Sequence, residues 1–176
     1  VSGCMVYHGY ERIIRGLFNY YKEKPSIIVE LHVVGDGPEL KKYRSFTERL
    51  KLNNYVFFYG SIYGEKLDEL YNGKNVGVSC LGMHRIGLNT GSPLKTAEYA
   101  SRGFPIILGY NDLLFSNKNF VFKADANEDP IEINEIVKWY LSGDFKSNEI
   151  RDFIIHLTSW EKQYQKIFSK TFLTNY

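Results

Sequence analysis

Apolar residues follow helical and strand spacing in turn along this chain. Residues 1–6 are short and apolar enough to predict the end of a strand, and residues 8–22 carry apolar side chains at the i, i+3 and i+4 spacing of a helix. The same analysis predicts further strands at 27–34, 55–59, 75–80, 104–108 and 120–123, and further helices at 38–51, 64–72, 131–141, 148–157 and 160–172, the last two being closing helices over about 147–172.

This alternation of strands and helices predicts parallel strands joined by right-handed crossovers. The expected fold is therefore a three-layer α/β/α Rossmann-like domain with an open, mainly parallel sheet. Ligands of such sheets bind beyond the carboxyl ends of the strands. The segments 60–63, 81–90 and 109–112 follow three predicted strands, so a site built from these loops is expected.

The stretch 82–108 combines a polar loop, a short helix and an apolar strand. Ser92 suits a helix N-cap, Pro93 suits the first turn and Gly103 suits the C-cap, so a helix is expected between them. Its first N–H groups lack acceptors inside the helix and form a ready anion site. This predicts phosphate binding at Gly91, Ser92, Leu94 and Lys95, with Glu98 one turn deeper to accept a sugar hydroxyl.

Glu98 has a second interpretation. Arg102 lies four positions further along the same helix, and an exposed glutamate–arginine pair at this spacing is common and contributes only a few tenths of a kcal/mol. Spacing alone supports a ligand contact and a surface ion pair about equally.

Composition limits the function classes. The chain has 176 residues, 44% of them hydrophobic, and a formal net charge of +2, which suits one globular domain and argues against nucleic acid as a partner. Two cysteines without metal-like spacing predict buried thiols in a reducing compartment. No apolar run approaches the roughly 20 residues that span a bilayer. The expected protein is a cytoplasmic monomer.

Two other kinds of site have weaker support. The four histidines are far apart in the sequence, and none has the i, i+4 partner of a helical metal site, so no bound metal is expected. His8 and His84 lie in predicted loops at the ligand edge, and the odds that each contacts a ligand are no better than even. Gly35-Asp36-Gly37 resembles the start of a dinucleotide fingerprint but lacks its third glycine, so a tight turn is favoured.

Several segments together resemble a known family. HVVGDGPEL, YVFFYGSIYGEKLDELY, LGMHRIGLN and SPLKTAEYASRGFPII are similar to the C-terminal, donor-binding half of bacterial family 4 (group 1) glycosyltransferases of the GT-B fold. The opening YHGYERIIRGL resembles a subset associated with capsule, O-antigen and exopolysaccharide assembly. The resemblance covers nearly the whole chain.

The resemblance implies roles for particular residues. Members of this family use two glutamates eight positions apart, the second contacting the donor ribose and the first the donor sugar. The second corresponds to Glu98, but the first position holds Thr90, which lacks the charge. His8 stands where a lysine is common. The implied donor-binding set is Glu98, Thr90, Gly91, Ser92, Leu94, Lys95, Arg85, His84, Gly60, Ser61 and Ile62, with Thr90 and His8 as candidate catalytic residues.

The resemblance also implies a reaction. It is retaining, hexosyltransferase-type transfer of a sugar from a UDP- or GDP-sugar, without a cofactor or an obligatory metal. Residues 1–176 are expected to be a single nucleotide-sugar-binding domain, a fragment of a longer two-domain enzyme whose acceptor domain is missing. Such a fragment would transfer little sugar, and the missing domain or a lipid acceptor would place the enzyme at the inner face of the bacterial membrane. The alternative is a non-catalytic nucleotide-binding or assembly module of the same fold.

Overall fold

The computed structural model describes residues 3–172, and their helices and strands alternate as the sequence predicts. The α-helices are α1 (Tyr10–Lys22), α2 (Leu40–Arg49), α3 (Glu65–Tyr71), α4 (Leu94–Ser101), α5 (Ile133–Ser142), α6 (Ser147–Thr158) and α7 (Trp160–Phe172). The strands are β1 (Leu31–Val34), β2 (Val56–Gly60), β3 (Gly77–Val78), β4 (Ile106–Leu108) and β5 (Val121–Lys123), and the short 3₁₀ helices are η1 (Val6–His8) and η2 (Met83–Ile86).

All strand pairs in the described part of the chain are parallel, which confirms the expected open α/β architecture. The strands nevertheless form two sheets and not one. β1 pairs with β2, and β3, β4 and β5 form a second sheet in that order. β1 and β3 therefore each present an edge without a neighbouring strand within the described residues.

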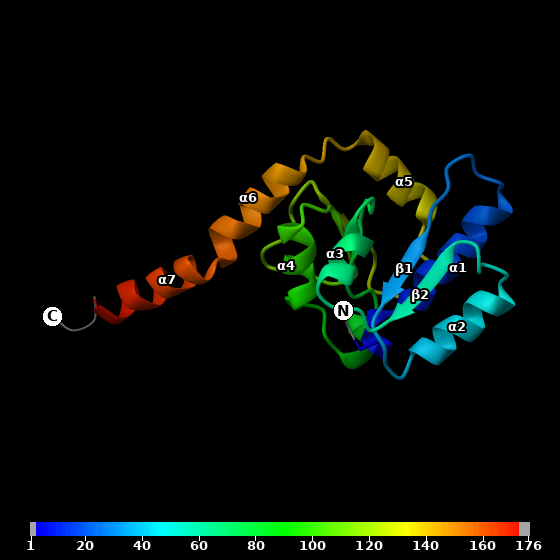
Figure 1. The fold of residues 1–176 in the computed structure, drawn as a ribbon, viewed down its shortest axis with the longest axis horizontal. Coiled ribbons are helices and arrows are strands. Elements are labelled where there is room, and N and C mark those ends of the chain that lie inside the picture. The colour runs from blue at the N-terminus through cyan, green and yellow to red at the C-terminus, as the bar shows by residue number, and fades with distance from the viewer. Residues whose placement is uncertain (1–2, 173–176) are drawn as a thin grey trace.

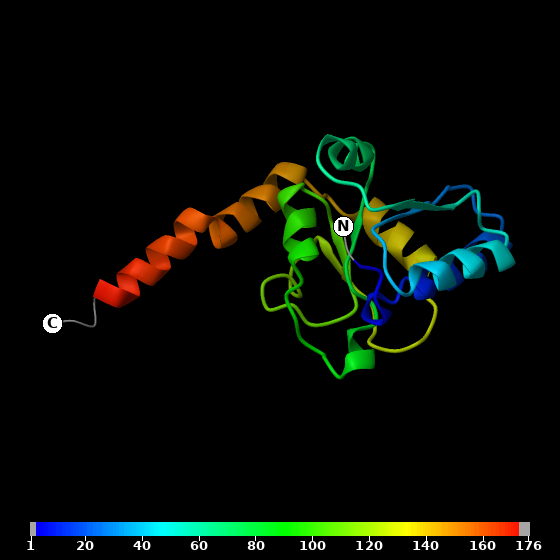
Figure 2. The same cartoon turned by 60° about the horizontal axis from the view of Figure 1, so that its bottom comes forward.

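Helices cover both faces of these strands (Figures 1 and 2). On one face α1 packs against α2 and α5, and on the other α4 packs against β3, β4 and α6. A hydrophobic core lies on each side of the boundary between the two sheets. One centres on α1, β1 and α5 and includes Ile14 and Leu17, and the other joins β4 to α6 through Leu108 and Ile150.

The closing helices leave the body of the domain. α6 contacts α4, and α7 continues from α6 away from both sheets, so the two form an arm in Figure 1. Both occupy residues where the sequence predicts helices.

The predicted strand at residues 1–6 is wrong for the residues that the structure describes. Residues 3–5 are irregular and η1 begins at Val6, while residues 1–2 lie outside the described part. The backbone N–H of Cys4 instead donates to the carbonyl of Asp36, and the carbonyl of Cys4 accepts from the N–H of Glu39. These bonds fasten the segment to the turn after β1.

Candidate functional site

The loops at the carboxyl ends of the strands are held together by backbone hydrogen bonds. Leu81 and Gly82, which follow β3, donate to the carbonyls of His8 and Tyr7 at 2.9 and 3.0 Å. The carbonyl of Gly60, at the end of β2, accepts from the N–H of Gly35 at 2.7 Å. The structure thus places η1 among the loops at the edge where the sequence predicts a site. Ser61 and Ile62 follow β2 at the same edge.

The start of α4 differs from the prediction. Pro93 and not Ser92 is the N-cap residue, and the helix begins at Leu94. The reason is that Thr90 forms a parallel bridge with Asn111, and the N–H of Gly91 donates to the carbonyl of Asn111 at 3.0 Å. This pairing keeps the chain extended up to the helix.

One of the four predicted anion donors is engaged elsewhere. Gly91 uses its N–H in the bridge, whereas the side chain of Ser92 lies beside the carboxylate of Asp112, whose pKa is raised by burial. The N–H groups of Leu94 and Lys95 belong to the first helical turn, which has no acceptors of its own. These two groups and the N–H of Ser92 are what remains of the predicted anion site.

Lys95 turns its side chain toward α1. Its Nζ donates to the hydroxyl of Tyr10 at 3.1 Å and lies 5.5 Å from the centre of that ring. The ring of Tyr10 also stacks on the ring of His8. Lys95 is half-buried in this contact.

His8 is a buried structural residue. It is 2% exposed, and its Nδ1 accepts the N–H of Met5 at 3.0 Å, which leaves the ring proton on Nε2. Burial, aided by the charge of Lys95, lowers the pKa of His8 to about 3. A neutral ring of this kind cannot replace the positive charge of the lysine that is common at its position.

We expect His8 to make the stability of the domain depend on pH. Its pKa is lower in the folded state than its ordinary value of 6.5, so the unfolded chain takes up a proton first, and stability falls as the pH drops from 6.5 toward 3. One proton contributes a slope of at most about 1.4 kcal/mol per pH unit. His8→Asn keeps an acceptor for Met5 and should remove this slope.

The measurement for His8 is urea unfolding at intervals between pH 7 and 5. His156 is exposed on α6, so His156→Asn is the matched control and should leave the slope as it is. An equal slope in all three proteins would show that His8 is not held neutral.

Arg85 and His84 form an ion-pair cluster with a residue that the sequence did not indicate. Both bind Glu128, at 2.9 Å from Arg85 Nε and 2.7 Å from His84 Nε2 to the same oxygen. Arg85 also pairs with Glu11 and donates to the carbonyl of Val6. The hydrogen bond from Arg85 lowers the pKa of Glu128 to about 2.

This cluster has little charge to offer a ligand. Two carboxylates, those of Glu11 and Glu128, surround the guanidinium of Arg85 and offset its charge. Nothing in the sequence pattern indicates Glu128, because it lies 43 positions from Arg85 in an irregular segment. Only the fold brings Glu128 beside Arg85.

Glu98 lies on α4, and its side chain contacts α3. Its carboxylate accepts from the hydroxyl of Tyr71 at 3.2 Å and lies 3.6 Å from Nε of Arg102. Arg102 also binds Asp68 at 2.7 Å and covers the ring of Tyr71. The ion pair considered from spacing is thus present. The carboxylate remains partly exposed, and a hydroxyl-bearing ligand could compete for it.

The structure therefore brings the predicted residues into separate groups. Lys95 is joined to His8 through Tyr10, Thr90 is paired with Asn111 just before Ser92, and Glu98 belongs to the α3–α4 contact. No group of three or more metal-binding side chains occurs among residues 3–172. In the same residues, no helix is long and apolar enough to cross a membrane.

Comparison with known proteins identifies relatives of this chain. Residues 9–151 match the family described as "Glycosyl transferases group 1". A search of curated proteins found no match.

Three solved structures share the fold. A glycosyltransferase from Rickettsia africae ESF-5 has a TM-score of 0.71 and 16% identity, over 99% of this chain and 47% of that one. WaaG, described as a glycosyltransferase involved in lipopolysaccharide biosynthesis, has a TM-score of 0.63 and 14% identity, over 100% and 46%. The lipopolysaccharide outer core galactosyltransferase WaaB has a TM-score of 0.57 and 17% identity, over 92% and 45%. The chain spans about half the length of each.

Proposed function

This chain belongs to the group 1 glycosyltransferases, and we propose that it is the half of such an enzyme that binds the nucleotide-sugar donor. The reaction is retaining, hexosyltransferase-type transfer from a UDP- or GDP-sugar, with no obligatory metal and no cofactor. The observation that carries the proposal is the family match, which includes the whole of α4 and the loops at the carboxyl edge.

The start of α4 supports phosphate binding. The N–H groups of Leu94 and Lys95 and the positive end of the helix dipole favour an anion there. Negative charge grows on the leaving diphosphate during transfer, so donors fixed at this point lower the barrier. Lys95, once released from Tyr10, adds a cation to the same place.

Glu98 supports binding of the nucleoside. We propose that the ribose hydroxyls take the place of the Tyr71 hydroxyl at this carboxylate, with Gly60, Ser61 and Ile62 beside the base. Arg102 would then hold the carboxylate in position. Thr90 remains the proposed contact to the donor sugar, through its hydroxyl.

The relatives suggest a pathway. WaaG and WaaB are described as acting in lipopolysaccharide synthesis, and we propose a role in bacterial surface polysaccharide assembly, in the cytoplasm at the inner face of the membrane. Because the chain spans about half of each solved structure, we also propose that it acts with a separate acceptor-binding half and transfers little sugar alone.

A non-catalytic nucleotide-binding module of the same fold is the second candidate. Thr90 in place of a glutamate, the neutral His8 and the charge-balanced Arg85 favour it, because all three weaken the charges expected at a transfer site. Both candidates bind nucleotide. Only the donor half of an active enzyme should also gain affinity from the sugar of a nucleotide sugar.

Calorimetry tests the proposal. UDP, GDP and dTDP are titrated beside their nucleosides, and one diphosphate should bind more tightly than its nucleoside because the start of α4 recognises phosphate. The matching nucleotide sugars are measured next. If each nucleoside bound as tightly as its diphosphate, the proposed phosphate site would be ruled out. If the nucleoside diphosphate bound as tightly as every nucleotide sugar made from it, the non-catalytic module would be favoured.

Glu98→Ala should weaken binding of the nucleoside diphosphate that calorimetry identifies by about ten- to a hundredfold. This corresponds to roughly 1.5 to 3 kcal/mol, as for a hydrogen bond to a charged group. The melting temperature should change little, because the Arg102 contact is partly exposed. Binding is measured by calorimetry and folding by circular dichroism.

Asp68→Ala is the matched control for Glu98→Ala. It removes the other carboxylate of Arg102 but no proposed ligand contact. The control should bind nucleotide normally. If both variants lost affinity equally, the effect would come from the position of Arg102, and Glu98 would not contact the ribose.

A further inference from the structure

Three buried hydroxyl groups form a closed ring beneath the start of α4. Ser79 follows β3, Tyr110 lies two residues after β4, and Thr96 belongs to the first turn of α4. The hydroxyl oxygens are 2.9 Å apart between Ser79 and Thr96, 3.0 Å apart between Ser79 and Tyr110, and 2.7 Å apart between Thr96 and Tyr110. All three residues are buried, so bulk solvent does not reach the ring.

The ring satisfies the proton of each of its hydroxyl groups. A hydroxyl group donates one hydrogen bond and accepts up to two, so each of the three can donate to one neighbour and accept from the other. Removal of one hydroxyl therefore breaks two contacts and leaves one buried proton without an acceptor in the ring. The three residues form a unit, because the loss of any one of them opens the ring.

Two members of the ring are fixed by a sheet, and the third is carried by a helix. The N–H of Ser79 donates to the carbonyl of Ile107 at 3.0 Å, which pairs the end of β3 with β4, and Tyr110 follows β4. Ser79 and Tyr110 are therefore held by the same sheet, whereas Thr96 belongs to α4. The ring ties the first turn of α4 to the ends of both strands.

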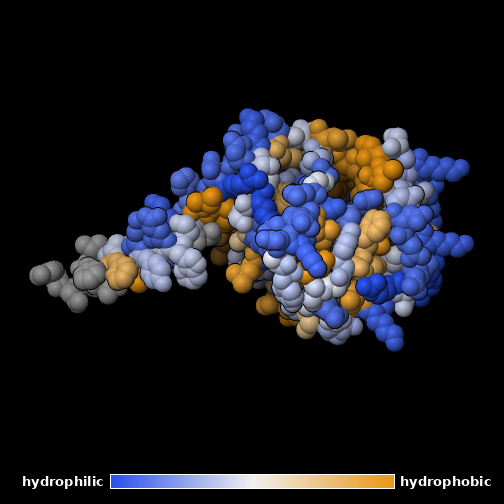
Figure 3. All heavy atoms as spheres, viewed as in Figure 1, coloured by the Kyte–Doolittle hydropathy of each residue, from blue (hydrophilic) through white to orange (hydrophobic). Residues whose placement is uncertain are grey.

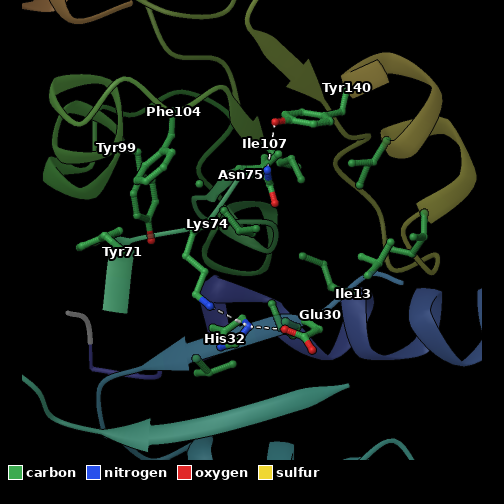
Figure 4. Close-up of a pocket in the computed structure, with 18 of the residues that line it drawn as sticks. Ile13, Glu30, His32, Tyr71, Lys74, Asn75, Tyr99, Phe104, Ile107 and Tyr140 are labelled. Atoms are coloured by element: carbon green, nitrogen blue, oxygen red, sulfur yellow. Dashed lines mark hydrogen bonds and ion pairs between the residues drawn. The ribbon is translucent and has the colours of Figure 1, made fainter. Parts of the chain in front are cut away.

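The two ends of α4 are held by different means. At the carboxyl end Ala100 is buried, and the ring of Tyr99 meets that of Tyr71 edge to face at 6.4 Å between centres, as Figure 4 shows. At the amino end Leu94 is 88% exposed, and Figure 3 shows mainly hydrophilic side chains on the outer face of α3 and α4. Thr96 is the buried residue of the first turn, so its hydroxyl takes the place of an apolar anchor.

Both segments of the proposed donor site adjoin the ring. Thr96 directly follows Lys95, whose N–H is one of the proposed phosphate donors. Tyr110 directly precedes Asn111, which forms the bridge with Thr90. The ring thus lies behind both the phosphate-binding turn and the segment proposed to contact the donor sugar. Opening of the ring would allow the start of α4 to move relative to that segment.

We propose that Ser79, Thr96 and Tyr110 are positioning residues for the diphosphate of the donor. They do not touch the ligand, and they hold the first turn of α4 where its N–H groups meet the phosphate oxygens. Hydrogen bonds are confined to narrow distances and angles, whereas apolar side chains pack in several arrangements, so the ring specifies one position of the helix. Donors fixed in advance bind more tightly, because less ordering is needed. The inference rests on the proposed function, since it requires phosphate at the start of α4.

Thr96→Val tests the ring, since valine keeps the branched shape of threonine without the hydroxyl. Calorimetry measures the affinity for the nucleoside diphosphate and for its nucleoside, and the ratio of the two affinities reports phosphate recognition. The ratio should fall about tenfold in Thr96→Val, while the affinity for the nucleoside stays within about twofold. Thr96→Ser restores a hydroxyl and should restore the ratio. An unchanged ratio in Thr96→Val would overturn the proposal.

Tyr110→Phe opens the ring from another element and gives an independent result if Thr96→Val does not fold. It should lower the ratio by the same factor. The double variant Thr96→Val/Tyr110→Phe should lower the ratio no further than either single variant, because the loss of one hydroxyl already opens the ring. Two losses that add would show that the hydroxyls act independently, and the ring would not be a positioning unit.

Ile150→Val is the matched control for these variants. Ile150 is buried in the same core as Tyr110 but lies on α6. The control should lower the melting temperature and leave the ratio unchanged, and an equal fall of the ratio would assign the effect to a general loosening of the core and overturn the proposal. A ratio of one in the unmodified protein would overturn both the phosphate site and this inference. A ratio that survives the opening of the ring would overturn this inference alone.

Discussion

Arg12→Met should destabilise the domain by about 3 to 5 kcal/mol, because it removes three hydrogen bonds of a buried guanidinium, one of them to the buried carbonyl of Leu81. Arg12 is 1% exposed and donates to the carbonyl of Asp129 at 2.8 Å, the carbonyl of Leu81 at 2.6 Å and the side-chain oxygen of Asn127 at 2.8 Å. One side chain thus joins α1, the loop after β3 and the segment before α5. Methionine keeps much of the stem and loses all three bonds.

Urea unfolding measures the effect of Arg12→Met, with the slope against urea as a check on two-state behaviour. Arg15, one turn along α1, donates to the exposed carbonyl of Glu128, so Arg15→Met should cost less than about 1 kcal/mol. Arg12→Lys should be intermediate, since lysine keeps the charge but not the fork of donors. A loss below 1 kcal/mol for Arg12→Met would mean that water satisfies the three acceptors.

Gly16→Ala should destabilise the domain by about 3 kcal/mol, although alanine favours a helix by about 1 kcal/mol over glycine. A Cβ at Gly16 would lie 2.1 Å from the carbonyl oxygen of Ile131 and 3.2 Å from Cγ1 of Ile133. The carbonyl of Ile131 cannot move away from α1 freely, because the N–H of the same residue donates to the carbonyl of Arg12 at 3.1 Å. The steric conflict therefore outweighs the helix propensity.

Asn19→Ala is the control for Gly16→Ala. Asn19 is exposed on the same helix, where alanine should stabilise slightly through its propensity. Thermal and urea unfolding of the two variants should move in opposite directions. If both were stabilised, the segment at Ile131 would have to be able to move away from α1.

Hydrophobic spacing predicted the fold well because most elements bury one face. The helix predicted at 8–22 is α1 at Tyr10–Lys22, and the closing pair at 148–157 and 160–172 agrees closely with α6 and α7. Strands were predicted too long. The expected strand 27–34 forms a ladder only over Leu31–Val34, because spacing reports burial and not the presence of a partner.

The site was less predictable because its contacts are long-range. Ser92 has the chemistry of an N-cap, but the bridge between Thr90 and Asn111 takes precedence. The sequence left two roles open for Glu98, and the structure shows the pair with Arg102 together with an unexpected bond from Tyr71. Local pattern cannot indicate a partner that another helix supplies.

The arm formed by α6 and α7 gives this protein two distinct fluorophores. Trp139 is packed against Phe122 and Phe145 in the body of the domain, whereas Trp160 is 78% exposed at the start of α7. These are the only two tryptophans in the sequence. Acrylamide should therefore quench the emission in two phases, and Trp139→Phe should leave a spectrum that reports on the arm alone.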